Sequence, residues 1–400
     1  MQRIQTDIFI AGGGIAGMIA ALSFASLGKK VFCVDPAAPI TERGAPNADM
    51  RSTAFLQPSK ELLGEIGLWE RLTPFAAPLQ VMRIVDAGGE KPEPRIESEF
   101  DASEISEEPF GWNYPNWLLR RECLAMMDES ENITFKAGVA AEKILTRSEF
   151  AQISLSNGEV IQAKLLVAAD GRNSQIRKAV GIDVKTIRYG QKALAFTVTH
   201  PIPHKNVSTE IHRSGGPFTL VPLPDHDGRP ASAIVWMERA PETLRLQQLS
   251  VNEFESAMNE RSCAILGPLS LNSPRTIWPI ISQYAKSMYS ERTALIAEAA
   301  HVVPPIGAQG LNMSLGDIRE LYKLTKASPE TLGSPQMLTK YHKARHPEIR
   351  VRIIGIDTLN RASMVSARPL RDMRAIGLNV IYGFAPVRKA LMKAGLGVKL

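Results

Sequence analysis

The clearest hydrophobic pattern lies near the N-terminus, where two apolar stretches flank a glycine-rich turn. Residues 7–11 predict a buried strand, residues 12–27 a turn that continues into a helix, and residues 30–35 a second strand that ends on a carboxylate. Residues 8–27 are also about long enough to cross a bilayer, but they contain four glycines, and each glycine costs a helix interior about 1 kcal/mol. The pattern therefore favours the βαβ unit of dinucleotide-binding proteins over a membrane helix.

The glycines of this unit have the spacing Gly-x-Gly-x-x-Gly, at Gly12, Gly14 and Gly17. The first allows a tight turn, the second lets a pyrophosphate approach the main chain, and the third lets the helix pack closely on the strand. The phosphates then contact free N–H groups at the start of the helix. Asp35, 18 residues after Gly17, can accept a hydrogen bond from a ribose 2′-OH. The motif alone fits both NAD and FAD.

A second informative run is an apolar strand from Ala163 that ends at Asp170-Gly171 and is followed by a helix with Ser174 and Arg177. A carboxylate at the C-terminal end of a strand, beside a helix start, is where α/β sheets bind ligands. Asp-Gly after a strand is also a common turn. The spacing Asp-Gly-x-x-Ser-x-x-Arg is what makes this run a candidate site.

A third run begins with a strand that we expect to end at Glu298 and continues through a loop rich in Pro and Gly. A helix follows near Gly310, and its free N–H groups could face an anion or an electron-rich ring. Pro305 and the neighbouring glycines fix a backbone that approaches a ligand closely.

Two further helices are predicted between these runs. Residues 49–55 lead into an apolar helical pattern through Leu63, and Asn116 begins a helix toward Met127. Arg51 opens the first of these elements, where its guanidinium could reach the phosphates of a cofactor. The alternative is a surface arginine near a helix start.

The pattern changes over residues 182–279 to short alternating stretches broken by Pro and Gly, which is typical of an antiparallel sheet. Residues 79–100 predict a hairpin with a turn at Gly88-Gly89. We therefore predict an α/β fold with a Rossmann-like domain, an antiparallel-sheet substrate domain that covers it, and C-terminal helices. The expected boundaries are 1–78, 101–181 and 280–330 for the first domain, 79–100 and 182–279 for the second, and 331–400 for a basic helical region.

The composition, with 44% hydrophobic and 22% charged residues, is that of a soluble globular protein. Cys33, Cys123 and Cys263 are scattered and form no CxxC pair. We interpret them as buried thiols in a reducing cytoplasm, and we predict neither a disulfide framework nor a metal site.

The net charge of +6 is unevenly distributed. Residues 340–400 contain 13 Lys and Arg against 3 Asp and Glu, a charge of +10, whereas the preceding 339 residues carry −4. This basic tail, with interleaved apolar side chains, suits contact with an anionic membrane surface. The alternative is an ordinary C-terminal helical pair with a basic solvated face. Nucleic acid is disfavoured because no binding motif accompanies the charge. The interleaved positions are Ile376, Leu378, Val380, Ile381, Tyr382, Phe384, Val387, Leu391, Met392 and Leu396.

In this order and at these spacings, the three runs resemble the class A flavoprotein monooxygenases, the aromatic hydroxylases of the para-hydroxybenzoate hydroxylase fold. The chain looks most similar to their ubiquinone-biosynthesis branch, and the resemblance covers nearly its whole length. It implies that the dinucleotide is FAD. The cofactor-binding residues that it implies are Gly12, Gly14, Gly17 and Asp35 at the adenosine half, Arg51, Asn116 and Arg120 after the first βαβ unit, Asp170, Gly171 and Glu298 at the strand ends, and Pro305, Gly307, Gln309, Gly310, Leu311 and Asn312 at the isoalloxazine.

The chain departs from this family at two places. The family usually has Gly-Asp where this chain has Ala297-Glu298, and the longer Glu side chain shifts the contact with the ribityl or ribose hydroxyls. Trp117 stands where many relatives have a charged or polar side chain. A second glycine fingerprint for NAD(P)H is missing, which agrees with a class in which the reductant binds transiently.

The resemblance also implies the chemistry. Reduced FAD reacts with O₂ to give a flavin hydroperoxide, whose distal oxygen is transferred to an electron-rich phenol ring. In this branch the ring bears a polyprenyl tail, so the substrate is expected to be lipophilic, and other ubiquinone-biosynthesis proteins are expected partners. No acid–base pair is required. His301 is a candidate for proton transfer, with a structural role as the alternative. We expect a cytoplasmic protein, peripheral at the inner face of the cytoplasmic membrane if the tail binds lipid.

Two other functions stay open on the sequence. One is a different flavin reaction on the same fold, such as that of an isoprenoid reductase or epoxidase, or of a hydroxylase of a soluble aromatic acid. The other is a non-catalytic accessory factor with weakened FAD binding, which the Ala297-Glu298 departure would explain.

Overall fold

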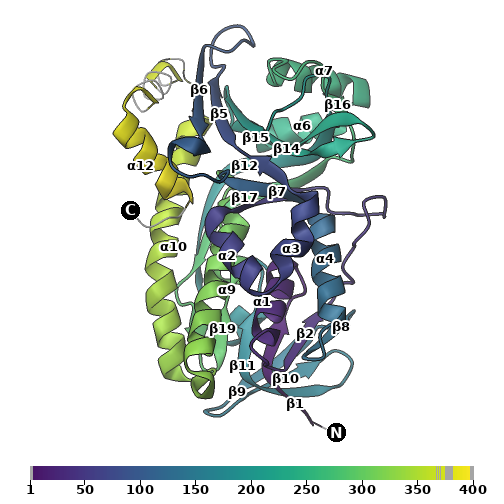
Figure 1. Cartoon of the computed structure of the whole chain (residues 1–400), viewed down its shortest axis with the longest axis vertical. Helices are drawn as coiled ribbons and strands as arrows, with labels where there is room; N and C mark the ends of the chain where they lie inside the picture. Colours follow the sequence, from purple (N-terminus) through teal and green to yellow (C-terminus); the bar gives the residue numbers. More distant parts are fainter. Residues whose placement is uncertain (1–2, 366, 368, 370, 374–381, 397–400) are drawn as a thin grey trace.

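The computed structural model describes residues 3–365, 367, 369, 371–373 and 382–396. Two large sheets lie one above the other, and a long C-terminal helix runs along one side of the molecule (Figure 1). The predicted α/β fold class is confirmed.

The N-terminal βαβ unit is present as β1 (Arg3–Ala11), α1 (Ile15–Ala25) and β2 (Val31–Asp35). β1 is parallel to β2 on one side and to β11 (Val160–Ala168) on the other. Strands in such a position are buried on both faces, which explains their continuous apolar sequence. Because the three strands are parallel, their C-terminal ends meet at one edge of the sheet.

This first sheet has the order β18-β19-β11-β1-β2-β8, and β10 and β9 continue from β11 as antiparallel strands. α1 packs against α4 (Asn116–Asp128) and α9 (Gln309–Ala327). Nine of the eleven residues of α1 are buried, so this helix is apolar on all sides and not amphipathic. The remaining strands are β8 (Ile133–Ala137), β9 (Ala141–Thr146), β10 (Ala151–Leu155), β18 (Tyr289–Ser290) and β19 (Thr293–Leu295).

The second sheet has the order β20-β17-β12-β15-β14-β13-β5-β6, with β16 beside β12. The predicted hairpin within residues 79–100 supplies β5 and β6 and joins the strands of residues 182–279 in this sheet. The domain boundaries themselves stay a prediction. The strands are β5 (Val81–Asp86), β6 (Ile96–Asp101), β12 (Val184–Thr199), β13 (Val207–His212), β14 (Pro217–His226), β15 (Arg229–Arg239), β16 (Ser270–Leu271), β17 (Thr276–Ala285) and β20 (His301–Val302).

The two faces of the second sheet belong to different cores. Leu194, Phe196 and Trp236 lie in a core that includes side chains of α6 (Ala240–Gln248) and α7 (Val251–Arg261). The alternate positions Ala193 and Met237 belong to the large core of the first sheet. The inner face of the second sheet therefore packs directly on the dinucleotide-binding half.

A three-stranded sheet, β3-β7-β4, was not predicted. Its strands are β3 (Ser52–Leu56), β4 (Ala77–Leu79) and β7 (Gly111–Pro115), and α2 (Gln57–Glu65) and α3 (Leu68–Leu72) follow β3. The predicted helix through Leu63 is present as α2, but the strand β3 directly before it was not predicted. The cause is long-range pairing: a Cβ atom on Gly111 would lie 2.4 Å from the carbonyl oxygen of Phe55, so only glycine lets the two strands meet.

The expectation for the third run was wrong at one point. β19 ends at Leu295, and Glu298 lies in the short helix α8 (Ala297–Ala300) instead of at a strand end. The other short elements are α5 (Gln175–Ala179) and the single 3₁₀ turns η1 (Thr73–Phe75), η2 (Ala102–Glu104) and η3 (Pro329–Thr331).

The predicted C-terminal helices are α10 (Pro335–Met364) and α12 (Ala385–Leu396). Of the apolar positions expected in the basic tail, Ile376, Leu378, Val380 and Ile381 lie outside the described residues. Within the described part of the chain, every helix is too short or too polar to cross a bilayer. Cys33 and Cys123 are buried, Cys263 is partly buried, and all three are free thiols.

Replacement of Gly17 tests the closest contact in the βαβ unit. A Cβ atom on Gly17 would lie 1.9 Å from the carbonyl oxygen of Gly12, so Gly17→Ala forces the helix off the turn. We expect the free energy of unfolding to fall by about 3 kcal/mol, the upper end of the cost of overpacking. Gly64→Ala in α2 is the matched control, because nothing lies within 4 Å of its Cβ position. Urea titrations that show equal losses for both variants would contradict this packing argument.

Candidate functional site

A cleft of about 440 Å³ lies at the C-terminal ends of β1, β2 and β11. It is lined by Gly12 and Gly14 from the glycine-rich turn, by Asp35, and by Asp170 and Gly171 after β11. Three segments that are far apart in the sequence thus bring five of the predicted residues together. The volume is in the range of small-molecule sites in proteins.

The three glycines of the turn have different surroundings. Gly12 has φ +110°, and a Cβ atom there would lie 2.3 Å from the carbonyl oxygen of Ala169, so the turn needs glycine. Gly17 has no room for a side chain because the helix packs on the turn. Gly14, in contrast, has nothing within 4 Å of its Cβ position and begins α1, whose first turn no side chain caps. A phosphate group fits this open helix start.

The carboxylate of Asp35 holds the turn in place at the rim of the cleft. Its Oδ2 atom accepts a hydrogen bond from the N–H of Gly13 at 2.7 Å, and its Oδ1 atom accepts one from the N–H of Ala37 at 2.8 Å. A carboxylate has about four lone-pair sites, so capacity remains for a sugar hydroxyl.

The motif after β11 serves mainly to join elements. Asp170 accepts hydrogen bonds from the Ser174 hydroxyl at 2.5 Å and from the N–H of Ile176 at 3.1 Å, which fixes the start of α5. The buried guanidinium of Arg177 donates to the carbonyl oxygen of Ala299 at 2.7 Å and thereby ties α5 to α8. The motif thus positions the edge of the cleft, and Asp170 is one of the residues that line it.

α8 begins with an unusual backbone conformation. Ala297 has φ +53°, in the left-handed region that favours glycine. This explains why the related family usually has glycine here, and it means that Ala297 is held by its surroundings. The neighbouring Glu298 is half-exposed and forms an ion pair with Arg172, with 3.3 Å between Nε and Oε2.

Arg51, Asn116 and Arg120 all donate hydrogen bonds to Asp49, a residue for which we predicted no role. Arg51 donates to Asp49 from Nε at 2.8 Å and from Nη2 at 2.7 Å, Asn116 from Nδ2 at 3.0 Å, and Arg120 from Nη2 at 3.3 Å. Burial favours a higher pKa for Asp49, but the hydrogen bonds and charge of Arg51 outweigh it and lower the pKa. The carboxylate therefore stays ionised and fixes both arginines.

The guanidinium of Arg51 has two further neighbours. It lies over the ring of Trp278 from the second sheet, 5.4 Å from the centroid. The hydrogen bond to Asp49 raises the pKa of Arg51, burial opposes this, and the negative charge of Glu298 adds a smaller increase. Arg51 thus lies between the small third sheet, the second sheet and α8.

The loop before α9 contains the predicted residues Pro305, Gly307, Gln309, Gly310, Leu311 and Asn312. α9 begins at Gln309, and no side chain caps its first turn, so the N–H groups there are free as the sequence predicted. The side chain of Asn312 is fully used inside the protein. It accepts from the N–H of Leu56 at 2.9 Å and the Ser59 hydroxyl at 2.7 Å, and donates to the carbonyl oxygens of Ala54 at 2.8 Å and Ala308 at 2.6 Å.

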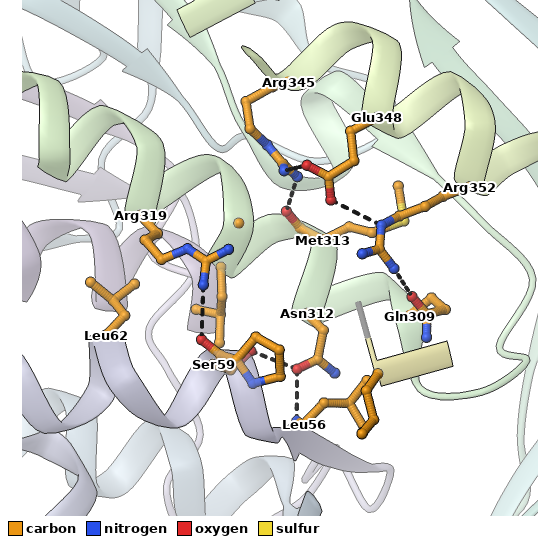
Figure 2. A pocket seen from close by; sticks show the side chains of 14 residues that line it. Leu56, Ser59, Leu62, Gln309, Asn312, Met313, Arg319, Arg345, Glu348 and Arg352 are labelled. Atoms are coloured by element: carbon orange, nitrogen blue, oxygen red, sulfur yellow. Dashed lines mark hydrogen bonds and ion pairs between the residues drawn. The ribbon is translucent and has the colours of Figure 1, made fainter. Parts of the chain in front are cut away.

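Gln309 is also engaged by the protein. Its Nε2 atom donates to the carbonyl oxygens of Gly307 and Gly395, each at 2.9 Å, and its Oε1 atom accepts from Arg352 at 2.8 Å. Figure 2 shows Gln309, Asn312 and Arg352 around a small cavity of about 30 Å³ beside α9. That volume suits a water molecule and not a cofactor.

His301 lies in a buried charge network below the same loop. Its Nε2 atom is 2.7 Å from Oδ2 of Asp317, whose Oδ1 atom accepts from Nε of Arg345 at 2.9 Å. Asp317 also accepts from the N–H of Ala297 at 3.2 Å. Burial favours a higher pKa for Asp317, but the charges of His301 and Arg345 outweigh it and lower the pKa. The network joins α8, α9 and α10, and the proton-transfer role of His301 stays a prediction.

The structure thus gathers the predicted residues into neighbouring groups: the cleft, the Asp49 cluster and the α9 loop. Asp49 and Asp317 were missed, although each had a signal in the sequence. Asp317 stands on the apolar face of a helix, where a carboxylate needs a partner. Asp49 stands two residues before Arg51, close enough for an ion pair. Among the described residues, no group of three or more His, Cys, Asp or Glu side chains forms a metal site.

An open glycine turn and a second uncapped helix start, set on a Rossmann-like sheet beneath a largely antiparallel sheet, fit the fold of the FAD-dependent monooxygenases. The chain belongs to the FAD binding domain family, whose model matches residues 5–352. This family match confirms FAD as the cofactor, which was predicted from the sequence.

Three comparisons with known proteins agree with this class. The chain is 28% identical over 394 residues to ubiquinone hydroxylase UbiL of Rhodospirillum rubrum, covering 98% of this chain and 89% of that protein. It is 25% identical over 412 residues to 3-demethoxyubiquinol 3-hydroxylase of Escherichia coli, and both chains are covered completely. The crystal structure of p-nitrophenol 4-monooxygenase PnpA from Pseudomonas putida matches with a TM-score of 0.79 at 17% identity, over 99% of both chains, which shows a shared fold.

The buried network gives a pH-dependent prediction. Asp317→Asn leaves Arg345 and His301 without their charge partner, so we expect the free energy of unfolding at pH 7 to fall by about 3–5 kcal/mol. Because the pKa of Asp317 is lower in the folded state, its contribution is complete above the unfolded pKa of about 3.9 and is lost as the pH falls through the folded value. Urea titrations should therefore show the difference between wild type and variant shrink below about pH 4.

Asp183→Asn is the control for this prediction. Asp183 forms an exposed ion pair with Lys286, and such pairs contribute about 0–1 kcal/mol. A loss for Asp317→Asn no larger than that for Asp183→Asn at pH 7 would show that the network does not hold the three helices.

Proposed function

We propose that this chain hydroxylates the aromatic ring of a polyprenylated phenol in ubiquinone biosynthesis, with bound FAD, NAD(P)H as a transient reductant and O₂. The observation that carries the proposal is the match, over nearly the whole chain, to proteins named as ubiquinone hydroxylases. The cleft and the α9 helix start support it, because they offer one site for the adenosine half of FAD and one for its ring.

The role of each group in this proposal follows from its position. Gly14 and the start of α1 receive the pyrophosphate, and Asp35 accepts a ribose hydroxyl. The positive end of α9, at Gln309 to Leu311, stabilises negative charge on the isoalloxazine. When bound, FAD supplies the redox chemistry with NAD(P)H and O₂. Arg51, held by Asp49, would bind the pyrophosphate, and Glu298 would take the place of the family's usual Asp at the cofactor hydroxyls.

The inner face of the second sheet suits a lipophilic ring. Paired positions on β12 and β15 that face the dinucleotide-binding half are small or apolar: Ala193 opposite Met237, and Ala195 opposite Val235. The Trp278 ring lies at the same face, beneath the Arg51 guanidinium. Such a lining excludes water from the reacting centre and offers no charge to a neutral ring. His301, bound to Asp317, serves in this proposal to position α8.

The test is a quinone profile of a strain that lacks this chain. We expect a polyprenylated phenol with one hydroxyl group fewer to accumulate, and the wild-type chain to restore the profile. Gly14→Ala should fail to restore it, because its methyl group fills the space left for the pyrophosphate, whereas Gly64→Ala should succeed. An unchanged quinone profile in the deletion strain would contradict the proposal. Product formation by the purified protein without O₂ would identify a reductase instead.

We further propose that the basic C-terminus holds the protein on an anionic membrane, where such a substrate resides. Seven of the eleven exposed large apolar side chains of the described structure lie between residues 351 and 391. α12 exposes Val387 and Leu391, and Phe384 directly before the helix is also exposed, so the three have the i, i+3 and i+7 spacing of one helix face. Exposed apolar residues beside lysines are the pattern of helices that lie in a membrane interface.

Flotation with vesicles of phosphatidylcholine and phosphatidylglycerol tests this contact. We expect the wild-type protein to float and the variant Phe384→Gln/Val387→Gln/Leu391→Gln to remain in the dense fraction. Leu244→Gln is the control, since Leu244 is an exposed leucine on α6, a helix packed on the second sheet, and should not change flotation. Equal flotation of the triple variant and the wild type would exclude α12 as the contact.

A further inference from the structure

We propose that α12 makes membrane contact and FAD binding cooperative. Its inner face positions the loop of residues 303–312 through Gln309, and its outer face docks on an anionic bilayer. The inference rests on the proposed membrane contact, and it goes beyond the family match, which ends at residue 352.

The inner face of α12 closes on the start of α9. Met392 and Leu396 are buried, with 7% and 6% of their surface exposed, and Leu396 lines the small cavity beside Leu56 and Asn312. The carbonyl oxygen of Gly395 accepts a hydrogen bond from Nε2 of Gln309 at 2.9 Å. The last turn of α12 therefore touches the residue that begins α9.

Gln309 in turn fixes a strained loop. Its Nε2 atom also donates to the carbonyl oxygen of Gly307, and Gly307 and Ala308 both have left-handed backbone, with φ +61° and +55°. Alanine rarely adopts this conformation, so the surrounding structure has to hold it. Since the free N–H groups of α9 follow directly, the position of Gln309 decides how they face the cofactor.

A continuous chain of polar contacts leads from Gln309 to the other end of the loop, and Figure 2 shows its part from Gln309 to Arg345. Arg352 donates to Gln309 at 2.8 Å and to Glu348 at 3.0 Å, and Glu348 pairs with Arg345. Arg345 bonds to Asp317, which holds His301 at the beginning of the loop. Both ends of the loop thus depend on one network, and α12 is its outermost member.

The outer face of α12 is apolar and flanked by cations. Val387 and Leu391 are 40% and 49% exposed, and Phe384 directly before the helix is 58% exposed, whereas Met392 and Leu396 on another side of the helix are buried. Lys389 and Lys393 are also exposed. This combination fits an anionic lipid surface better than a neutral one. Because the exposed and the buried side chains lie on different sides of α12, one helix can contact the lipid and the loop at the same time.

α12 is also held weakly enough to respond to lipid. In the described structure, two buried side chains, the Gly395 contact and the ion pair between Arg388 and Glu104, at 2.7 Å, connect it to the body of the protein. A helix of twelve residues is marginal without such contacts. Docking of α12 is therefore a local equilibrium, and a ligand of its outer face shifts that equilibrium toward the docked helix. Linkage then requires that lipid tighten FAD binding and FAD tighten lipid binding by the same factor.

The experiment measures FAD affinity of the full-length protein, freed of FAD, by fluorescence anisotropy of added FAD. It compares no vesicles, phosphatidylcholine vesicles, and mixed phosphatidylcholine–phosphatidylglycerol vesicles. We expect the mixed vesicles alone to lower the Kd for FAD by about 5-fold or more, the usual lower bound of coupling between sites. This readout needs no substrate and no turnover, so it is independent of the proposed hydroxylation.

Three variants test the inner and the outer face of α12 separately. Phe384→Gln/Val387→Gln/Leu391→Gln should keep the vesicle-free Kd for FAD but lose both flotation and the vesicle effect. Gln309→Ala should still float, yet its Kd for FAD should no longer respond to vesicles. Leu244→Gln should behave as the wild type does.

Wild-type protein that floats but binds FAD with the same Kd in all three conditions would overturn the coupling and leave the membrane contact standing. Wild-type protein that does not float would overturn both. A third outcome is a wild-type protein that does not float and is a dimer in light scattering, together with a triple variant that is a monomer. In that case a second copy of the chain, and not lipid, covers α12.

Discussion

A single buried carboxylate holds the segments that shape the ring end of the site. Asp317 is fully buried, and an unpaired charge there would be strongly unfavourable. It is tolerated because His301, Arg345 and the N–H of Ala297 surround it, and these come from β20, α10 and α8. The three segments must therefore be in place together, and the loop between His301 and Gln309 has fixed ends only when they are.

The site is built mainly from backbone. Both helix starts that face it, those of α1 and α9, lack a capping side chain, so their N–H groups are left for a ligand. Side chains that look like ligand contacts in the sequence hold this backbone instead. Asp35 bonds the glycine turn, and Asn312 bonds β3 and α2. A substitution of Asn312 would therefore disturb the site through the position of the main chain.

Local signals in the sequence predicted the βαβ unit, the helix at Asn116, the hairpin within residues 79–100 and the uncapped start of α9, because each depends on neighbouring residues. These local signals could not predict contacts between distant segments. β3 is a strand only because it pairs with β7, and the close approach at Gly111 has no local signature. Glu298 lies in a helical turn and not at a strand end because Ala297 is held in a left-handed conformation. The cofactor contacts of the individual residues stay predictions.

The buried thiols have a consequence for the durability of a flavoprotein that works in oxygen. Cys33 lies in β2, directly beneath the glycine turn, and burial raises its pKa far above the usual range. Burial also raises the pKa of Cys123 to about 12. Only the thiolate reacts readily with peroxide, and exposure is needed as well. Hydrogen peroxide that escapes from the flavin would thus meet no reactive thiol in β2 or α4, and the packing of the core protects these two cysteines from oxidation.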